Sequence, residues 1–166
     1  MNPNYYQGNA DHPWHLSVGA VVINDKKEVC CHYFNEVTIK NDTFSNLHIL
    51  MRETIEQGET LEQTLNRGLL EEFGVTGKIR TYVGSIKAEF PHKGKVVEKT
   101  TLYFLMDLIN FDPSKRQNTD LESQSEIQWQ SLDFLISKMK EQAIRLGRSD
   151  ADESAVLERV ENILNG

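Results

Sequence analysis

The sequence predicts an α/β fold, because runs typical of strands flank one helix with marked ends and precede two further helical patterns. Three of the predicted strands are rich in β-branched and aromatic side chains, and they cover residues 16–23, 78–89 and 96–109. The predicted helices have apolar side chains at helical spacing, and they cover residues 61–73, 132–146 and 151–164.

The first predicted strand leads through an Asn-Asp-Lys-Lys turn into a second strand at residues 28–34, so we expect a hairpin. Gly19 lies inside the first strand, where a glycine indicates a close approach by a packed neighbour or a ligand. His15, just before this strand, could stack on a base or simply close one end of the sheet.

A short strand at residues 44–51 leads to the helix at residues 61–73. Thr60 and Gln63 have the spacing of a capping box, which predicts the helix start. Gly74 is the usual left-handed residue after a helix end. One apolar face of the helix should pack on a core, and the residues that we assign to it are Leu61, Leu65, Leu69 and Leu70.

The second pair of strands is joined by a Gly-containing loop at residues 90–95. Lys93 and Lys95 give this loop a local positive charge, so it is either a phosphate clamp or a solvated hairpin tip. Lys99 and Tyr103 are four residues apart in the following strand and should face the same side of the sheet. Residues 111–124 form a long polar loop before a late strand at residues 126–132.

Length and composition indicate one folded domain. A chain of 166 residues is large enough to bury a core, and 26% charged with 39% hydrophobic residues argues against disorder. We assign residues 1–14 to a polar N-terminal arm and residues 15–166 to a single domain.

Charge and cysteine content bound the functional classes. The net charge of −7 argues against a DNA-binding footprint. Cys30 and Cys31 are adjacent, so a strand would send them to opposite faces as free thiols, which suits the reducing cytoplasm. The sequence has no signal-peptide core and no apolar run of membrane-spanning length, so we expect a cytoplasmic protein without a membrane anchor.

Several carboxylates gather around the predicted helix at residues 61–73. Arg67 and Glu71 are four residues apart on one face, Glu72 is adjacent, and Glu56 and Glu59 precede the helix. Carboxylates that converge on one face repel one another unless a cation lies among them, and Mg²⁺ prefers such oxygen ligands. The alternative is an ordinary solvated helix face.

This segment resembles the Nudix box, whose pattern is Gly, five residues, Glu, seven residues, Arg-Glu-aliphatic, one residue, Glu-Glu, one residue, Gly-aliphatic. The matching residues are Glu59, Arg67, Leu69, Glu71, Glu72, Gly74 and Val75. Two positions differ, since Glu53 stands where the pattern has its first Gly and Gly68 stands where it has the Glu after the Arg.

The resemblance implies a Nudix-type α/β/α sandwich with a mixed central sheet, and hydrolysis of a pyrophosphate bond in a nucleoside diphosphate linked to another moiety. It implies a Mg²⁺ or Mn²⁺ cofactor and a small-molecule nucleotide substrate, and a homodimer is compatible with it. The implied metal ligands are Glu71 and Glu72 with a backbone carbonyl at Arg52 or Glu53, and Glu56 joins them because it lies near this group of acids. Arg67 would orient a carboxylate, while Glu59 and Gly74 would support the motif.

The remaining site residues follow from weaker parts of the resemblance. The strand after His15 is similar to one that borders the substrate in the family, and residues 98–105 resemble a strand of its dinucleoside polyphosphate enzymes. His15, Lys99 and Tyr103 are therefore candidate substrate-binding residues. Lys93 and Lys95 join them because of the positive charge of their loop. The late strand often provides a metal ligand or general base in the family, so Glu122 and Glu126 are the candidates here.

Gly68 leaves three functional hypotheses open. The chain is an active hydrolase whose base is Glu122 or Glu126, an impaired fold kept as a nucleotide-binding or regulatory module, or a scaffold that binds a protein through its C-terminal helices. Because Glu is a better helix former than Gly, we expect Gly68→Glu to raise stability with Mg²⁺ and also the hydrolytic rate.

Overall fold

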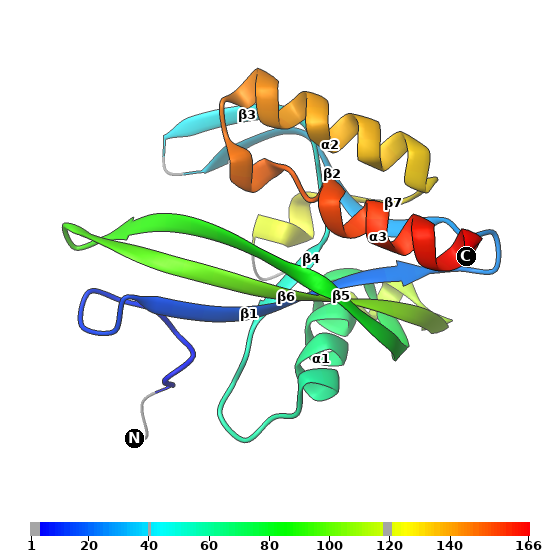
Figure 1. Cartoon of the computed structure of the whole chain (residues 1–166), viewed down its shortest axis with the longest axis horizontal. Helices are drawn as coiled ribbons and strands as arrows, with labels where there is room; N and C mark the ends of the chain where they lie inside the picture. The colour runs from blue at the N-terminus through cyan, green and yellow to red at the C-terminus, as the bar shows by residue number, and fades with distance from the viewer. Residues whose placement is uncertain (1–3, 40, 118–120) are drawn as a thin grey trace.

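A computed structural model describes residues 4–39, 41–117 and 121–166 of the chain (Figure 1). In the described part, seven strands form one sheet with the path β3-β2-β1-β6-β5. These five strands are Asp42–Ile49, Val29–Ile39, Trp14–Ile23, Lys95–Phe111 and Val75–His92. Two short strands complete the sheet, β4 (Met51–Thr54) against β1 and β7 (Glu126–Gln130) against β2.

The sheet is mixed because its central pair is parallel. β1 runs parallel to β6 from the pair Trp14↔Glu98 to the pair Ile23↔Asp107. The other strand pairs are antiparallel. β1 and β2 share the register pair Ile23↔Val29, and farther along β1 pairs with β4 instead. The sheet therefore divides beside β1, and β4 leads from this division to helix α1 (Leu61–Phe73).

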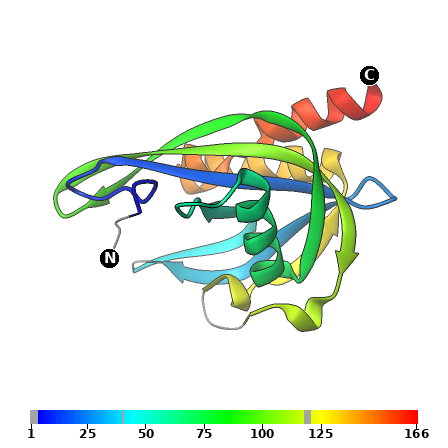
Figure 2. The same ribbon diagram turned by 90° about the horizontal axis from the view of Figure 1, so that it is seen from below.

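Helices cover both faces of the sheet. α1 lies below it in Figure 1, while α2 (Leu132–Leu146) and α3 (Ser154–Asn165) lie above it. The alternation along β1 supplies both cores. Val18, Ala20 and Val22 belong to the cluster that includes Leu65, Leu69 and Phe73 of α1. Val21 and Ile23 belong to the cluster that includes Leu135, Met139, Val156 and Val160 of α2 and α3. This arrangement confirms the α/β/α sandwich (Figure 2).

Most predicted elements are present, with changed ends. The two hairpins and helix α2 form as expected. β1, β5 and β6 extend beyond their predicted bounds and β2 runs past its predicted end, whereas β7 ends at Gln130 rather than at residue 132. The expected strand at residues 44–51 is divided into β3 and β4. α3 begins at Ser154 rather than residue 151, because Ser149–Ala151 form a separate 3-10 turn and Asp152 is extended. None of the described helices is long and apolar enough to cross a membrane.

The predicted apolar face of α1 is correct at Leu65 and Leu69 and wrong at Leu61 and Leu70. Leu65 and Leu69 are buried, whereas Leu61 is 36% exposed and Leu70 is 41% exposed. Leu70 follows Leu69 by about 100° around the helix and so turns away from the sheet. Leu61 lies at the first position of the helix, at the edge of the packed surface. Phe73, one turn after Leu69, completes the buried face instead.

Candidate active site

Both ends of α1 are fixed by the groups that the sequence marks. Thr60 Oγ accepts a hydrogen bond from the Gln63 backbone N–H at 3.1 Å, and Gln63 Oε1 accepts one from the Thr60 N–H at 2.8 Å. Gly74 ends the helix with φ 70°, and its N–H donates to the Leu70 carbonyl. The predicted capping box and left-handed stop are confirmed. The helix therefore presents Arg67, Glu71 and Glu72 in a defined orientation.

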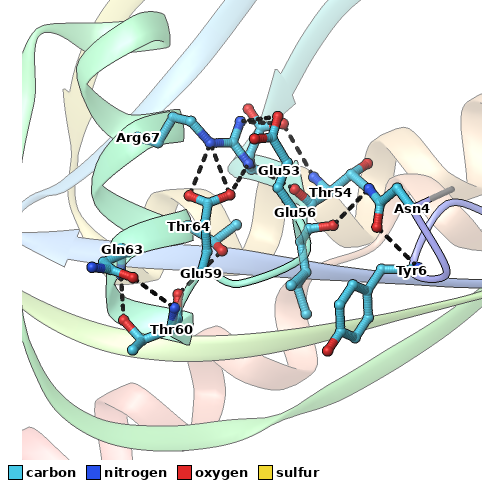
Figure 3. A network of polar contacts seen from close by, with 11 residues as sticks. Asn4, Tyr6, Glu53, Thr54, Glu56, Glu59, Thr60, Gln63, Thr64 and Arg67 are labelled. Atoms are coloured by element: carbon cyan, nitrogen blue, oxygen red, sulfur yellow. Dashed lines mark hydrogen bonds and ion pairs between the residues drawn. The ribbon is translucent and has the colours of Figure 1, made fainter. Parts of the chain in front are cut away.

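Arg67 gathers the acids of the segment before the helix (Figure 3). Its Nε donates to both carboxylate oxygens of Glu59, at 3.2 and 3.1 Å, and its Nη2 donates to the Thr54 carbonyl at 2.9 Å. Nη1 lies 3.2 Å from Glu53 Oε1 and 3.8 Å from Glu56 Oε1. Arg67 thus joins α1 to β4 and to the intervening loop, and it neutralises part of their negative charge.

The carboxylate of Glu72 belongs to a buried series of polar contacts. Its Oε1 lies 2.8 Å from Nε2 of His32 on β2, and His32 Nδ1 lies 2.6 Å from Ser125 Oγ. Arg116 donates to the same Ser125 Oγ at 2.6 Å. Burial, as the largest cause, together with the positive charges of Arg116 and Arg52, lowers the pKa of His32 to about 3. His32 is therefore neutral at pH 7.

The hydrogen bond from Arg116 indicates which group donates in each of the following contacts, from Ser125 to His32 to Glu72. Because Arg116 donates to Ser125 Oγ, the serine hydroxyl can donate to His32 Nδ1, and Nε2–H of the neutral ring then donates to Glu72. The sequence analysis missed His32 and Ser125. A histidine within the apolar run of β2 is the available signal, but its partner Glu72 is 40 residues away.

The donor atoms near α1 suit a hard divalent cation. Glu56, Glu71 and Glu72 offer carboxylate oxygens, the ligands that Mg²⁺ prefers. Glu56 is exposed, Glu71 is half-buried and Glu72 is buried. Across the described ranges, however, the structure shows no group of three or more His, Cys, Asp or Glu residues that could hold a metal ion. Arg52 lies in β4 opposite Gly19, and its Nε is 3.9 Å from Glu153 Oε2.

Gly68 faces packed side chains rather than open space. A Cβ at this position would lie 2.7 Å from Met51 Sδ and 2.9 Å from Glu53 Cβ. Both distances are shorter than normal contacts, so any side chain requires a neighbour to move. This strain opposes the gain in helix propensity that underlies the expectation for Gly68→Glu, and that expectation stays a prediction.

A pocket of about 260 Å³ connects Glu72 with positive side chains. Its charged lining residues are Arg52, Glu72, Glu89, Lys99, Arg148 and Asp150. Arg148 is bound by Asp150 at 2.7 Å, whereas Arg52 is 3.9 Å from Glu153. Arg52 and Lys99 are therefore the lining cations that we consider for binding phosphate oxygens. Burial and the charge of Arg52 lower the pKa of Lys99 to about 8.

The other predicted substrate residues lie elsewhere. Tyr103 is 1% exposed, and its hydroxyl donates to Glu153. Its ring fills the space beside Gly19, where a Cβ would lie 2.5 Å away, so that glycine serves packing. His15 is buried under the N-terminal arm, with Nδ1 accepting from the Gly8 N–H at 3.1 Å. This placement favours its role in closing the sheet end.

Lys93 and Lys95 are exposed at or beside the tip of the β5–β6 hairpin and do not line this pocket. Glu126 is exposed on β7, and its Oε1 accepts from Gln128 Nε2 at 3.4 Å. The preceding residue, Ser125, is the one that reaches the Glu72 chain through His32. The Glu122 side chain lies outside the part of the molecule that the structure describes. Glu126 and Glu122 both remain predictions for the general base.

Comparisons with known proteins agree with this architecture. The family model described as NUDIX domain matches residues 13–149. A protein named "Putative mutator protein MutT4" from Mycobacterium tuberculosis (strain CDC 1551 / Oshkosh) is 35% identical over 85 residues. That alignment covers 51% of this chain and 33% of the relative, so it spans about a third of the relative's length.

Two solved structures share the fold. A NUDIX hydrolase from Nitrosomonas europaea aligns over 99% of this chain and 90% of its own, with 18% identity and a TM-score of 0.62. The MutT protein from Methanosarcina mazei Go1 aligns over 93% of this chain and 97% of its own, with 19% identity and a TM-score of 0.57. Because the family model covers most of the chain and the structure contains the corresponding helix and sheet, the chain belongs to the NUDIX domain family.

Proposed function

We propose that this chain hydrolyses a pyrophosphate bond in a nucleoside diphosphate linked to another moiety, with Mg²⁺ or Mn²⁺ as cofactor. The observation that carries the proposal is the pocket in which Glu72 lies with Arg52 and Lys99. A carboxylate for a cation and two positive side chains for phosphate oxygens line the same pocket. This combination suits a polyphosphate substrate on a chain of net charge −7.

The residues have distinct proposed roles. Glu72, Glu71 and Glu56 would hold the cation together with the Arg52 carbonyl, and His32 would orient Glu72 through its Nε2–H. Arg52 and Lys99 would bind phosphate oxygens, and Arg67 would keep the acidic loop in place. A bound divalent cation neutralises phosphate charge and activates water for attack. Glu126 or Glu122 would accept the proton from that water.

The test is a phosphate-release assay over a panel of nucleoside triphosphates, nucleotide sugars and dinucleoside polyphosphates, with Mg²⁺ or Mn²⁺. We expect at least one substrate to be cleaved, and Glu72→Gln to lower its turnover by about a hundredfold or more. Calorimetry should show weaker Mg²⁺ binding in the same variant. Glu36→Gln is the control, because it removes a carboxylate from an exposed position of β2. Full activity of Glu72→Gln would contradict the proposed site.

A second candidate function is a nucleotide-binding module without turnover. It is favoured by the engagement of Glu53 and Glu59 with Arg67 and by the lack of a three-residue metal group among the described residues. Nucleotide binding without phosphate release over the whole panel would support it over the hydrolase.

A further inference from the structure

Glu53 and Gly68 exchange the residue types that the motif pattern places at their positions, and the structure puts the two residues in contact. Gly68 is on the buried side of α1, and Glu53 is on β4, which packs against this helix. A Cβ built on Gly68 would lie 2.9 Å from Glu53 Cβ and 3.2 Å from Glu53 Cγ. The stem of Glu53 thus fills the volume into which a side chain at position 68 would grow.

The Glu53 carboxylate extends from this volume toward the helix acids. Its Oε1 lies 3.2 Å from Arg67 Nη1 and accepts from the Thr54 N–H at 3.2 Å. The side chain is 22% exposed. Burial raises the pKa of Glu53, Arg67 lowers it, and the negative charge of Glu71 raises it again. Glu53 also acts on the pKa of Lys99, so its charge lies within range of both α1 and the pocket.

We propose that Glu53 supplies from β4 the carboxylate that α1 lacks at position 68, and that it is a ligand of the divalent cation. This inference rests on the proposed function, which requires that cation. Both contacts described for the carboxylate are made by Oε1, so Oε2 is the oxygen that we assign to the cation. Glu53 would add an oxygen from β4 to the carboxylates that α1 supplies.

The steric contact makes the two positions interdependent. Met51 Sδ is near the end of a flexible side chain and can move away from a new Cβ, whereas Glu53 Cβ is fixed by the β4 backbone. We therefore expect a side chain at position 68 to cost less stability when residue 53 is small. The reciprocal variant Glu53→Gly with Gly68→Glu restores the residue types of the motif pattern and keeps one carboxylate in the site.

The first experiment measures Mn²⁺ binding by calorimetry and electron paramagnetic resonance, without nucleotide. Glu53→Gln keeps the shape of the side chain and removes its charge, so we expect affinity to fall by about tenfold or more, as it does even when groups behind metal ligands are lost. Glu72→Gln should behave similarly. Glu36→Gln, on exposed β2, should bind Mn²⁺ like the unchanged chain.

The second experiment is a double-mutant cycle on thermal unfolding in chelator. Gly68→Ala should lower the Tm in the unchanged background and should lower it less, or raise it, in the Glu53→Gly background. The reciprocal double variant should recover most of the Mn²⁺ affinity that Glu53→Gly loses. Because the cycle is run without metal, it tests the steric pairing separately from the ligand role.

The outcomes separate the inference from the proposed function. If Glu72→Gln loses Mn²⁺ affinity and Glu53→Gln does not, Glu53 is no ligand and the hydrolase proposal stands. If both lose affinity while the panel shows no phosphate release, the ligand assignment stands and the hydrolase proposal is wrong. Mn²⁺ binding that is undetectable in the unchanged chain, or Gly68→Ala effects that are equal in both backgrounds, would overturn the inference.

Discussion

The surroundings of Lys99 bring its pKa close to neutral pH, so its charge changes with pH in that range. Burial is the largest cause of its lowered pKa of about 8, and the charge of Arg52 adds to it. Glu153, Asp150 and Glu53 act in the opposite direction. At pH 7 the ammonium form therefore predominates and can bind a phosphate oxygen, whereas above pH 8 the neutral amine predominates and cannot attract an anion.

The pH dependence of kcat/KM should report this titration. Because kcat/KM reflects groups of the free enzyme, we expect it to fall by about tenfold for each unit above pH 8. Lys99→Arg keeps its charge at these pH values, so this decline should move to higher pH. Initial rates from pH 6 to 10 with a cleaved nucleotide provide the measurement. The same decline in Lys99→Arg would assign it to another group.

Helix α1 differs from α2 in how tightly its end is enclosed. Both helices end at a glycine in the left-handed region, Gly74 with φ 70° and Gly147 with φ 64°. A Cβ on Gly74 would lie 2.0 Å from the Asp112 carbonyl oxygen, whereas a Cβ on Gly147 would meet nothing within 4 Å. The Asp112 N–H also donates to the Gly74 carbonyl. The end of α1 is thus locked against the chain that follows β6.

The two glycines form a matched pair for mutation. Gly147→Ala should cost about 1 kcal/mol, the usual penalty of a left-handed alanine. Gly74→Ala should cost clearly more, because the backbone of Asp112 must also move. Urea unfolding of both variants measures the difference. Equal losses would show that the Asp112 segment adapts without strain.

The sequence predicted those elements whose causes are local. Thr60, Gln63 and Gly74 act within a few residues, and the predicted ends of α1 were confirmed. The exposure of Leu61 and Leu70 depends on which turns of the helix the sheet covers, which the helical period alone does not specify. The contact of Glu72 with His32 joins α1 to β2 across 40 residues, and that of Gly68 with Glu53 depends on β4 packing. No local pattern marks such partners.

On the scale of the whole molecule, three histidines are buried in different parts of the fold. His15 lies under the N-terminal arm, His32 lies beside α1, and His48 lies next to α2. Burial is the main cause of the lowered pKa in each case, to about 4 for His15 and about 3 for His32. The unfolded chain therefore binds these protons at a higher pH than the folded chain does.

Stability should consequently fall as the pH drops below about 6.5, and it should continue to fall until the folded histidines titrate. Each such proton contributes up to about 1.4 kcal/mol per pH unit. Urea unfolding between pH 5 and 7 measures the slope. His15→Gln should reduce this slope by the contribution of up to one proton. An unchanged slope in His15→Gln would contradict this origin.

The adjacent cysteines of β2 have opposite surroundings. Cys30 belongs to the core beneath α1, and Cys31 belongs to the core beneath α2 and α3. Burial raises the pKa of Cys31 to about 12 and that of Cys30 well above its ordinary value. The thiolate is the nucleophile that attacks an alkylating reagent, so neither sulfur reacts while its layer is closed. The two adjacent cysteines therefore report on different layers of the sandwich. Whichever cysteine is alkylated first shows which helix layer separates first from the sheet.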